Sequence, residues 1–263
     1  MFRSRKIAKT TGTPSPAQPD AIIRFMLSGP LDFDPGTEYV YSNFGYCVLG
    51  RVIEKITGRK YEEYVREAVL APMGIRQMRI GASRDGNQAP GEVRYYTPSD
   101  NAGDSVFDEG VKVPFPYGGF CLEAMDAHGG WIASAVDLAR FAAALDDSAQ
   151  CPVLKKESLA SLSEPPPAPV SRKKDGSLAD SFYGCGWMVR PVGNDGRANY
   201  WHDGSLPGTA TLLVRRWDGL SWAALFNQRS ADPKLPDGTI DRALHRAAEA
   251  TGEWPSEDLF EKK

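Results

Sequence analysis

Residues 33–54, FDPGTEYVYSNFGYCVLGRVIE, are the stretch from which the fold can be read. The Pro-Gly pair is followed by the polar triplet Tyr41-Ser42-Asn43, and apolar residues then recur at helical spacing as far as Thr57. This pattern predicts a buried helix over residues 43–57 that Gly58 closes, since glycine readily adopts the left-handed conformation of a helix end. By itself, the triplet is typical of an N-terminal helix cap.

Similar signals predict helices elsewhere in the chain. They indicate a short helix at residues 20–27, a second at 61–70, one that follows a capping-box-like sequence at Ser134 and Asp137, and a last one at 239–250. Residues 1–20 are basic and then rich in Thr, Pro and Ser, which is typical of a loop or loose end. The polar, Gly- and Pro-rich residues 81–119 are interpreted as an irregular insertion that covers one lobe.

Strand patterns appear in the second half of the chain. They predict strands at residues 184–190, 198–202, 209–216 and 220–227, with a hairpin at Trp217-Asp218-Gly219-Leu220 because Asp-Gly suits a tight turn. We therefore expect an α+β protein with an antiparallel sheet flanked by helices and a helical lobe. We expect a single domain over 1–263, in which residues 20–183 form a mostly helical or irregular lobe and residues 184–250 form the sheet and last helix.

Composition narrows the functional classes. The 263 residues are 41% hydrophobic and 25% charged with a formal net charge of −3, so no basic stripe for nucleic acid is present. No apolar run reaches the roughly 18 residues of a membrane span. The four cysteines form no Cys-x-x-Cys pair, and the grouping of Asp126, His128, His202 and Asp203 matches no zinc signature. We expect neither a metal nor another cofactor.

Four further stretches accompany residues 33–54. They are APMGI at 71–75, GGWIASAVDLARF at 129–141, YGCGW at 183–187 and HDGSLPGT at 202–209. Together and in this order, these stretches resemble the serine beta-lactamase-related family, which comprises class C beta-lactamases, D-alanyl-D-alanine carboxypeptidases and family VIII esterases. The resemblance covers roughly residues 20–230 and implies a beta-lactamase/transpeptidase-like fold.

The resemblance also implies an acyl-transfer site. Such chemistry needs a nucleophile, a base that takes its proton, and N–H donors for the developing oxyanion. In this family the nucleophile is the serine of Ser-x-x-Lys, and a Tyr-x-Asn element matches Tyr41 and Asn43. Tyr41 is expected to share the role of general base, with its pKa lowered by cations such as the motif lysine. Asn43 is expected to orient that lysine and the substrate amide.

A third family element, His-x-Gly, matches His202 and Gly204. His202 is expected to line the site opposite Tyr41, although a strand histidine packed beside Trp201 is the simpler interpretation without the resemblance. Gly204 and Ser205 are expected to contact substrate, with the Ser205 backbone N–H as an oxyanion donor. His128 is expected in a loop near the cleft, where it shapes substrate choice.

The nucleophile is the element that the resemblance does not supply. Lysine follows serine by three positions only at Ser171-Arg172-Lys173-Lys174, in a Pro-rich loop after Tyr41 rather than at the start of an earlier helix. Ser42 and Ser205 are unattractive substitutes, and no Gly-x-Ser-x-Gly elbow occurs. We therefore expect the chain to lack the front of the family fold and to be inactive as printed.

Three functional hypotheses remain. The chain is part of a serine hydrolase that cleaves an ester, a beta-lactam or a D-alanyl peptide through an acyl-enzyme; or it is a non-catalytic ligand-binding protein of the same fold; or it is a hydrolase with an unconventional serine. In each case the partner is a small molecule or peptide rather than nucleic acid. An uncovered sheet edge and apolar face predict self-association. The cellular compartment stays open, because Met1–Lys6 shows no signal-peptide pattern whereas the resemblance implies an exported protein.

Overall fold

The structure of the chain is a computed structural model that describes residues 1–97, 102–229 and 239–257. The chain divides into two compact units, residues 1–229 and 230–263. The helices of the first unit are α1 (Ser4–Thr11), α2 (Pro19–Leu27), α3 (Asn43–Thr57), α4 (Tyr61–Val65), α5 (Leu122–Met125), α6 (Ala135–Ala143) and α7 (Lys156–Ser161), with a π-helical turn η1 (Arg66–Leu70) and a 3-10 turn η2 (Asp126–His128). Its strands are β1 (Arg79–Ile80), β2 (Ala102–Asp104), β3 (Lys112–Pro114), β4 (Trp131–Ile132), β5 (Phe182–Tyr183), β6 (Met188–Val192), β7 (Arg197–Leu206), β8 (Thr209–Arg215) and β9 (Ser221–Phe226).

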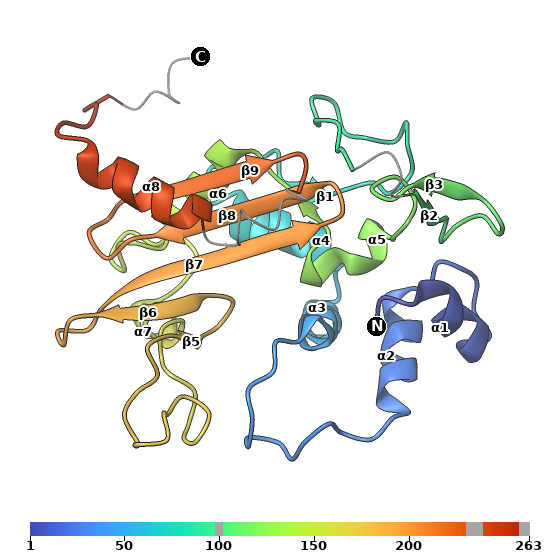
Figure 1. Cartoon of the computed structure of the whole chain (residues 1–263), viewed down its shortest axis with the longest axis horizontal. Helices are drawn as coiled ribbons and strands as arrows, with labels where there is room; N and C mark the ends of the chain where they lie inside the picture. Colours follow the sequence, from blue (N-terminus) through green and yellow to red (C-terminus); the bar gives the residue numbers. More distant parts are fainter. Residues whose placement is uncertain (98–101, 230–238, 258–263) are drawn as a thin grey trace. The chain divides into compact units, whose positions relative to one another are not determined.

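The main sheet is an antiparallel meander in the order β5-β6-β7-β8-β9 (Figure 1). In its register His202 on β7 is opposite Leu213 on β8, and Arg215 is opposite Ser221 across the predicted hairpin. Gly219 in that hairpin has φ +85°, a conformation that suits glycine. The predicted α+β class and antiparallel sheet are confirmed.

Helix α6 packs against β8 and β9. The buried core between them contains Ala142 and Leu145 from the end of α6, and Phe182, Trp187, Val189, Ala198 and Leu213 from the sheet region. The capping sequence predicted at Ser134 is confirmed, because the Ser134 hydroxyl accepts a 3.0 Å hydrogen bond from the Asp137 backbone N–H. Capping and core packing thus fix the helix against the sheet that carries His202.

Helix α3 has the predicted bounds and ends at Gly58, which has φ 68°. The prediction that this helix is buried is wrong. Only Cys47 and Gly50 are buried, whereas Leu49, Val52 and Ile56 are 52%, 42% and 79% exposed. Because α3 contacts α2, α4 and η2 only along part of its circumference, an apolar stripe faces solvent.

The first 20 residues are not a loose end, as their composition predicts. They contain α1, whose Ile7 and Ala8 are buried against Ala17, Ala21 and Ile22 from α2 and the residues before it. Arg5 Nε donates a 2.7 Å hydrogen bond to the Ser105 carbonyl, and Ser15 Oγ donates one of 2.6 Å to that of Val106. Packing and long-range hydrogen bonds therefore outweigh the local composition.

Residues 81–119 are largely irregular over the part that the structure describes, as predicted, but they contain the two-stranded sheet β2-β3. The sheet face that we expected to be apolar and exposed is mostly covered. Trp187, Leu212 and Val214 are buried, whereas Leu225 and Phe226 on β9 are exposed.

The described part of the second unit contains helix α8 (Thr239–Ala250), with the bounds that the sequence predicts. His245 Nε2 lies 3.5 Å from Asp241 Oδ1 one turn earlier in this helix. Within the described ranges, no helix is both long enough and apolar enough to cross a membrane.

Candidate functional site

Tyr41 and Asn43 flank the first turn of α3. Ser42 between them is the N-cap residue, and its hydroxyl accepts a 3.0 Å hydrogen bond from the Gly45 backbone N–H. The cap fixes the direction in which the chain enters the helix. It leaves Tyr41 just outside the helix, half exposed, and makes Asn43 the first helical residue.

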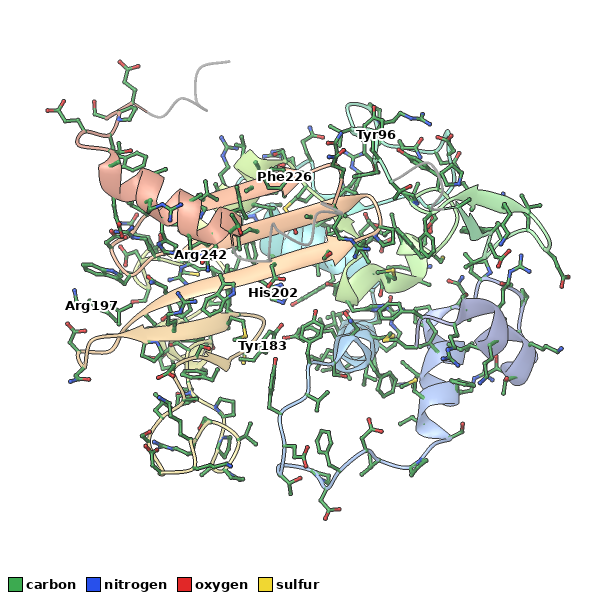
Figure 2. All side chains as sticks on the ribbon, in the orientation of Figure 1. Tyr96, Tyr183, Arg197, His202, Phe226 and Arg242 are labelled. Atoms are coloured by element: carbon green, nitrogen blue, oxygen red, sulfur yellow. The ribbon has the colours of Figure 1, made fainter. Side chains whose placement is uncertain are left out.

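His202 lies on β7, and the fold brings it to Tyr41. The ring centroids of Tyr41 and His202 are 6.3 Å apart, although 160 positions separate the two residues along the chain. Tyr183 on β5 completes the group, with its ring 5.9 Å from that of Tyr41 and 5.8 Å from that of His202. Figure 2 shows the labelled side chains of Tyr183 and His202 next to each other. The structure therefore brings Tyr41 and His202 together, while their roles in a catalytic site stay a prediction.

Hydrogen bonds hold His202 on both sides of its ring. The Tyr183 hydroxyl is 3.0 Å from Nε2, and Nδ1 is 2.8 Å from the Asp203 carbonyl oxygen. The Tyr183 ring also stacks on that of Tyr39 at 6.0 Å. Tyr46 on α3 is close enough to raise the pKa of both Tyr41 and Tyr183. We call Tyr39, Tyr41, Tyr46, Tyr183 and His202 the tyrosine–histidine cluster.

The hydroxyls of Tyr39, Tyr41 and Tyr183 have higher pKa values than an ordinary tyrosine. Burial raises the pKa of Tyr41, and Tyr46 and Asp203 raise it further. Burial likewise raises the pKa of Tyr39 and, strongly, that of Tyr183, to which Tyr46 also contributes. The lowered pKa expected for Tyr41 depends on a nearby cation. The described residues that act on Tyr41 raise its pKa instead. At neutral pH these hydroxyls are proton donors in the isolated chain.

Gly204 and Ser205 follow on the same strand. A Cβ at Gly204 would collide with Thr211 Oγ1 on β8, so a larger residue at this position of His-x-Gly would force the Thr211 side chain to move. The Ser205 hydroxyl is exposed and accepts a 3.3 Å hydrogen bond from Arg229. The role of the Ser205 backbone N–H as an oxyanion donor stays a prediction.

His128 lies in a different environment from the tyrosine–histidine cluster. Its ring is 6.0 Å from that of Phe2, and it lines a small cavity of about 40 Å³ together with residues that include Ile22, Cys121 and Met125. Burial lowers the pKa of His128, while Asp126 opposes this change. The contacts described for His128 do not include Tyr41 or His202, so they give no support to the role in substrate choice.

The hydroxyls of Ser42 and Ser171 are both engaged in hydrogen bonds in this structure. Ser42 Oγ caps α3, as described above. Ser171, the serine of the chance Ser-x-x-Lys match, is buried and donates a 2.5 Å hydrogen bond to the Pro166 carbonyl. Lys174 of the same match is exposed in the loop. The interpretation of this match as chance agrees with the geometry.

A larger cavity of about 400 Å³ lies elsewhere in the first unit, lined by Pro72, Met73, Ala143, Ala144, Asp146, Asp147, Gln150 and Pro152. Size alone favours such a cavity as a binding site. However, Asp146 in its lining is paired with Arg215 at 2.6 Å, and the cavity contains no serine, cysteine, histidine or tyrosine. Acyl-transfer chemistry is therefore better matched by the tyrosine–histidine cluster. Among the described residues, no group of three His, Cys, Asp or Glu side chains could hold a metal ion.

Sequence reasoning missed Tyr183, Tyr39 and Tyr46 as members of the site. Tyr183 opens the YGCGW stretch at 183–187, and Tyr39 and Tyr46 lie in the stretch at 33–54. The available signal was the concentration of tyrosines within stretches already singled out. The number of tyrosines in these stretches does not predict which rings contact one another in the folded chain.

Known proteins match the chain over most of its length. Penicillin-binding protein 4* of Bacillus subtilis is 25% identical over 228 residues, which cover 86% of this chain and 47% of that protein. Penicillin-binding protein 4 of Amycolatopsis lactamdurans is 26% identical over 190 residues, which cover 69% of this chain and 45% of that protein. The chain thus spans about half the length of these two relatives.

Solved structures share the fold. The D-amino acid amidase of Ochrobactrum anthropi superposes with a TM-score of 0.65 at 21% identity, covering 89% of this chain and 63% of that chain. A penicillin-binding protein of Bacillus halodurans does so with a TM-score of 0.61 at 20% identity, covering 88% and 62%. The beta-lactamase family profile matches residues 6–247. The chain therefore belongs to the beta-lactamase family, the serine beta-lactamase-related group that also contains penicillin-binding proteins.

Proposed function

We propose that this chain supplies the Tyr-x-Asn and His-x-Gly elements of a serine acyl-transfer site. The site cleaves a small ester, an amide, a beta-lactam or a D-alanyl peptide through an acyl-enzyme once a Ser-x-x-Lys helix completes it. The observation that carries the proposal is the approach of Tyr41, before α3, to His202 on β7, with ring centroids 6.3 Å apart. Two elements that are far apart in the sequence meet there, and each carries a residue type that acyl-transfer chemistry uses.

The roles follow from the geometry and from acyl-transfer chemistry. Tyr41 takes the nucleophile's proton when a lysine beside it stabilises the phenolate, which reverses the present upward shift of its pKa. His202 is held on both ring nitrogens and lines the opposite side. Asn43 at the first turn of α3 orients the lysine and the substrate amide. The similarity to penicillin-binding proteins and to a D-amino acid amidase supports small acyl donors as substrates.

The chain by itself fits the second function, ligand binding without turnover. The observation that favours it is the state of the serines, because Ser42 caps α3 and Ser171 is buried. Without an activated nucleophile, the binding contacts and oxyanion donors retain only a small part of the rate of an intact enzyme.

The test compares the chain alone with the chain fused to a segment that bears Ser-x-x-Lys. We expect the chain alone to show no acylation by nitrocefin and only trace hydrolysis of p-nitrophenyl acetate. The fusion should hydrolyse at least one of these substrates. Tyr41→Phe in the fusion should lower kcat by about 100-fold or more, because it removes a proton acceptor and keeps the ring.

The matched control is Tyr39→Phe, which deletes a hydroxyl from the neighbouring ring that we assign no proton-transfer role. Equal kcat values for Tyr41→Phe and Tyr39→Phe in an active fusion would show that Tyr41 has only a structural role at the start of α3. Nitrocefin turnover by the unfused chain at the rate of an intact family hydrolase would overturn the proposal. Ligand binding by the chain alone is measured separately, by calorimetry with a D-alanyl-D-alanine peptide.

A further inference from the structure

Tyr183 is the residue that joins Tyr41 and His202. It lies on the short strand β5, and its ring meets both of theirs nearly edge to face, at interplanar angles of 81° and 79°. Its hydroxyl is the partner described for His202 Nε2, at 3.0 Å. The resemblance to known hydrolases pointed to Tyr41 and His202 but assigned nothing to this third ring.

The hydrogen bonds around His202 fix where its proton lies. Nδ1 is 2.8 Å from the Asp203 carbonyl oxygen, which can only accept a hydrogen bond, so Nδ1 carries the hydrogen. A neutral imidazole has one N–H, and Nε2 is therefore an acceptor. The Tyr183 hydroxyl, 3.0 Å away, must donate to it.

The Tyr183 hydroxyl is suited to be a permanent donor. Burial raises the pKa of Tyr183 strongly, and Tyr46 and Tyr41 raise it further. A hydroxyl that keeps its proton through the neutral pH range can go on donating to the acceptor Nε2 of His202. The two hydrogen bonds of the ring thus run in one direction, from Tyr183 to His202 and on to the Asp203 carbonyl.

We propose that Tyr183 is a positioning residue of the site, which holds the His202 ring in its Nδ1–H form with Nε2 as a hydrogen-bond acceptor beside Tyr41. The proposal rests on the proposed function for its catalytic meaning, but the tautomer itself is a property of the free chain. The consequence for the site is that the side chain opposite Tyr41 is a ring of fixed orientation and tautomer, whereas a free imidazole would rotate and exchange tautomers.

The test is the ¹⁵N spectrum of the histidine rings in the chain as it exists, followed through a pH titration to its alkaline plateau. The chain has three histidines, and single His→Gln variants assign them. We expect His202 to show a protonated Nδ1 and a bare, hydrogen-bonded Nε2. A wild-type His202 with its proton on Nε2 at the plateau would overturn the proposal without any variant.

Tyr183→Phe removes the donor and keeps the ring. We expect the Nε2 resonance to move toward that of a nitrogen without a hydrogen bond, and the Nε2–H form to become detectable. Tyr39→Phe is the matched control, because it deletes a hydroxyl from a ring that stacks on Tyr183 without bonding His202. Ring shifts in Tyr183→Phe that equal those in Tyr39→Phe would contradict the proposal. If Tyr183→Phe does not fold, the wild-type tautomer remains the deciding measurement.

Activity provides a separate readout. In the active Ser-x-x-Lys fusion, we expect Tyr183→Phe to lower kcat about tenfold, which corresponds to the loss of one oriented hydrogen bond, and to leave KM nearly unchanged. An inactive fusion with the expected His202 tautomer would count against the proposed function only. If the fusion is active and Tyr183→Phe changes neither the His202 tautomer nor kcat, the result would count against the positioning role only.

Discussion

At the scale of single residues, the candidate site is built from neutral hydroxyls and one imidazole. Tyr39, Tyr41 and Tyr183 all have raised pKa values because burial disfavours the phenolate. The nearest described carboxylate to affect Tyr41, that of Asp203, acts in the same direction. A cation beside Tyr41 would favour its phenolate, which is the physical reason why the proposed chemistry assigns a lysine-bearing helix to this site.

A second residue-scale feature predicts the behaviour of the fold in acid. Glu123 accepts hydrogen bonds from the Ser83 backbone N–H at 3.0 Å and from the Ser83 hydroxyl at 2.5 Å, and Ser83 is fully buried. Burial alone would raise the pKa of Glu123, but these hydrogen bonds outweigh it and lower the pKa. The folded state therefore binds a proton at Glu123 less readily than the unfolded state does. The resulting stabilisation is present above the ordinary glutamate pKa of about 4.3 and is lost as the pH falls through the lower folded value.

We expect Glu123→Gln to lower the free energy of unfolding at pH 7, and the difference from wild type to shrink below about pH 4. Urea denaturation at several pH values measures both quantities. Glu157→Gln on α7 is the control, because Glu157 is exposed and should give the same unfolding curve as wild type at every pH. A difference for Glu123→Gln that grows in acid would contradict the assigned direction.

At the scale of elements, the start of α3 carries both structure and function. Ser42 caps the helix and thereby fixes the approach of Tyr41. We expect Ser42→Ala to reduce the free energy of unfolding by about 0.5–2 kcal/mol, and Ser42→Asn to retain most of it because asparagine also accepts from the free N–H groups. Denaturation midpoints of the two variants test this. Equal losses in both would show that the 3.0 Å bond to Gly45 contributes little.

The elements that could be predicted from sequence are those with local signals. The Ser42 and Ser134 caps, Gly58 at a helix end and the Asp218-Gly219 hairpin each act through neighbours a few residues away, and the structure has all four. Helix α1 was missed because Ile7 and Ala8 are stabilised by α2 rather than by local composition. Tyr183 was missed for the same reason. Its partners, Tyr41 and His202, are distant in sequence, and β5 has only two residues and no recognisable strand pattern.

At the scale of the first unit, two sets among the exposed apolar residues concern the expected association surface. Leu49, Val52 and Ile56 recur along one face of α3, and Leu225 and Phe226 lie on β9, at one end of the strand order. Leu212 and Val214 on the sheet are buried. We therefore expect association through α3 and β9 rather than through the face of the sheet. Exposed apolar side chains of this kind favour contacts with other chains or with dyes.

We expect the purified chain to bind a hydrophobic dye and to self-associate in sedimentation experiments at tens of micromolar. Leu49→Lys combined with Ile56→Glu should reduce both effects, because lysine and glutamate suit an exposed helix face and remove most of the apolar stripe. Leu225→Lys tests the β9 edge separately. The control is Val93→Lys, which charges an exposed apolar side chain in the irregular segment outside both sets. If the α3 variant and the control reduce association equally, net charge rather than the α3 face is responsible; a wild-type chain that is monomeric and binds no dye would exclude both surfaces as association sites.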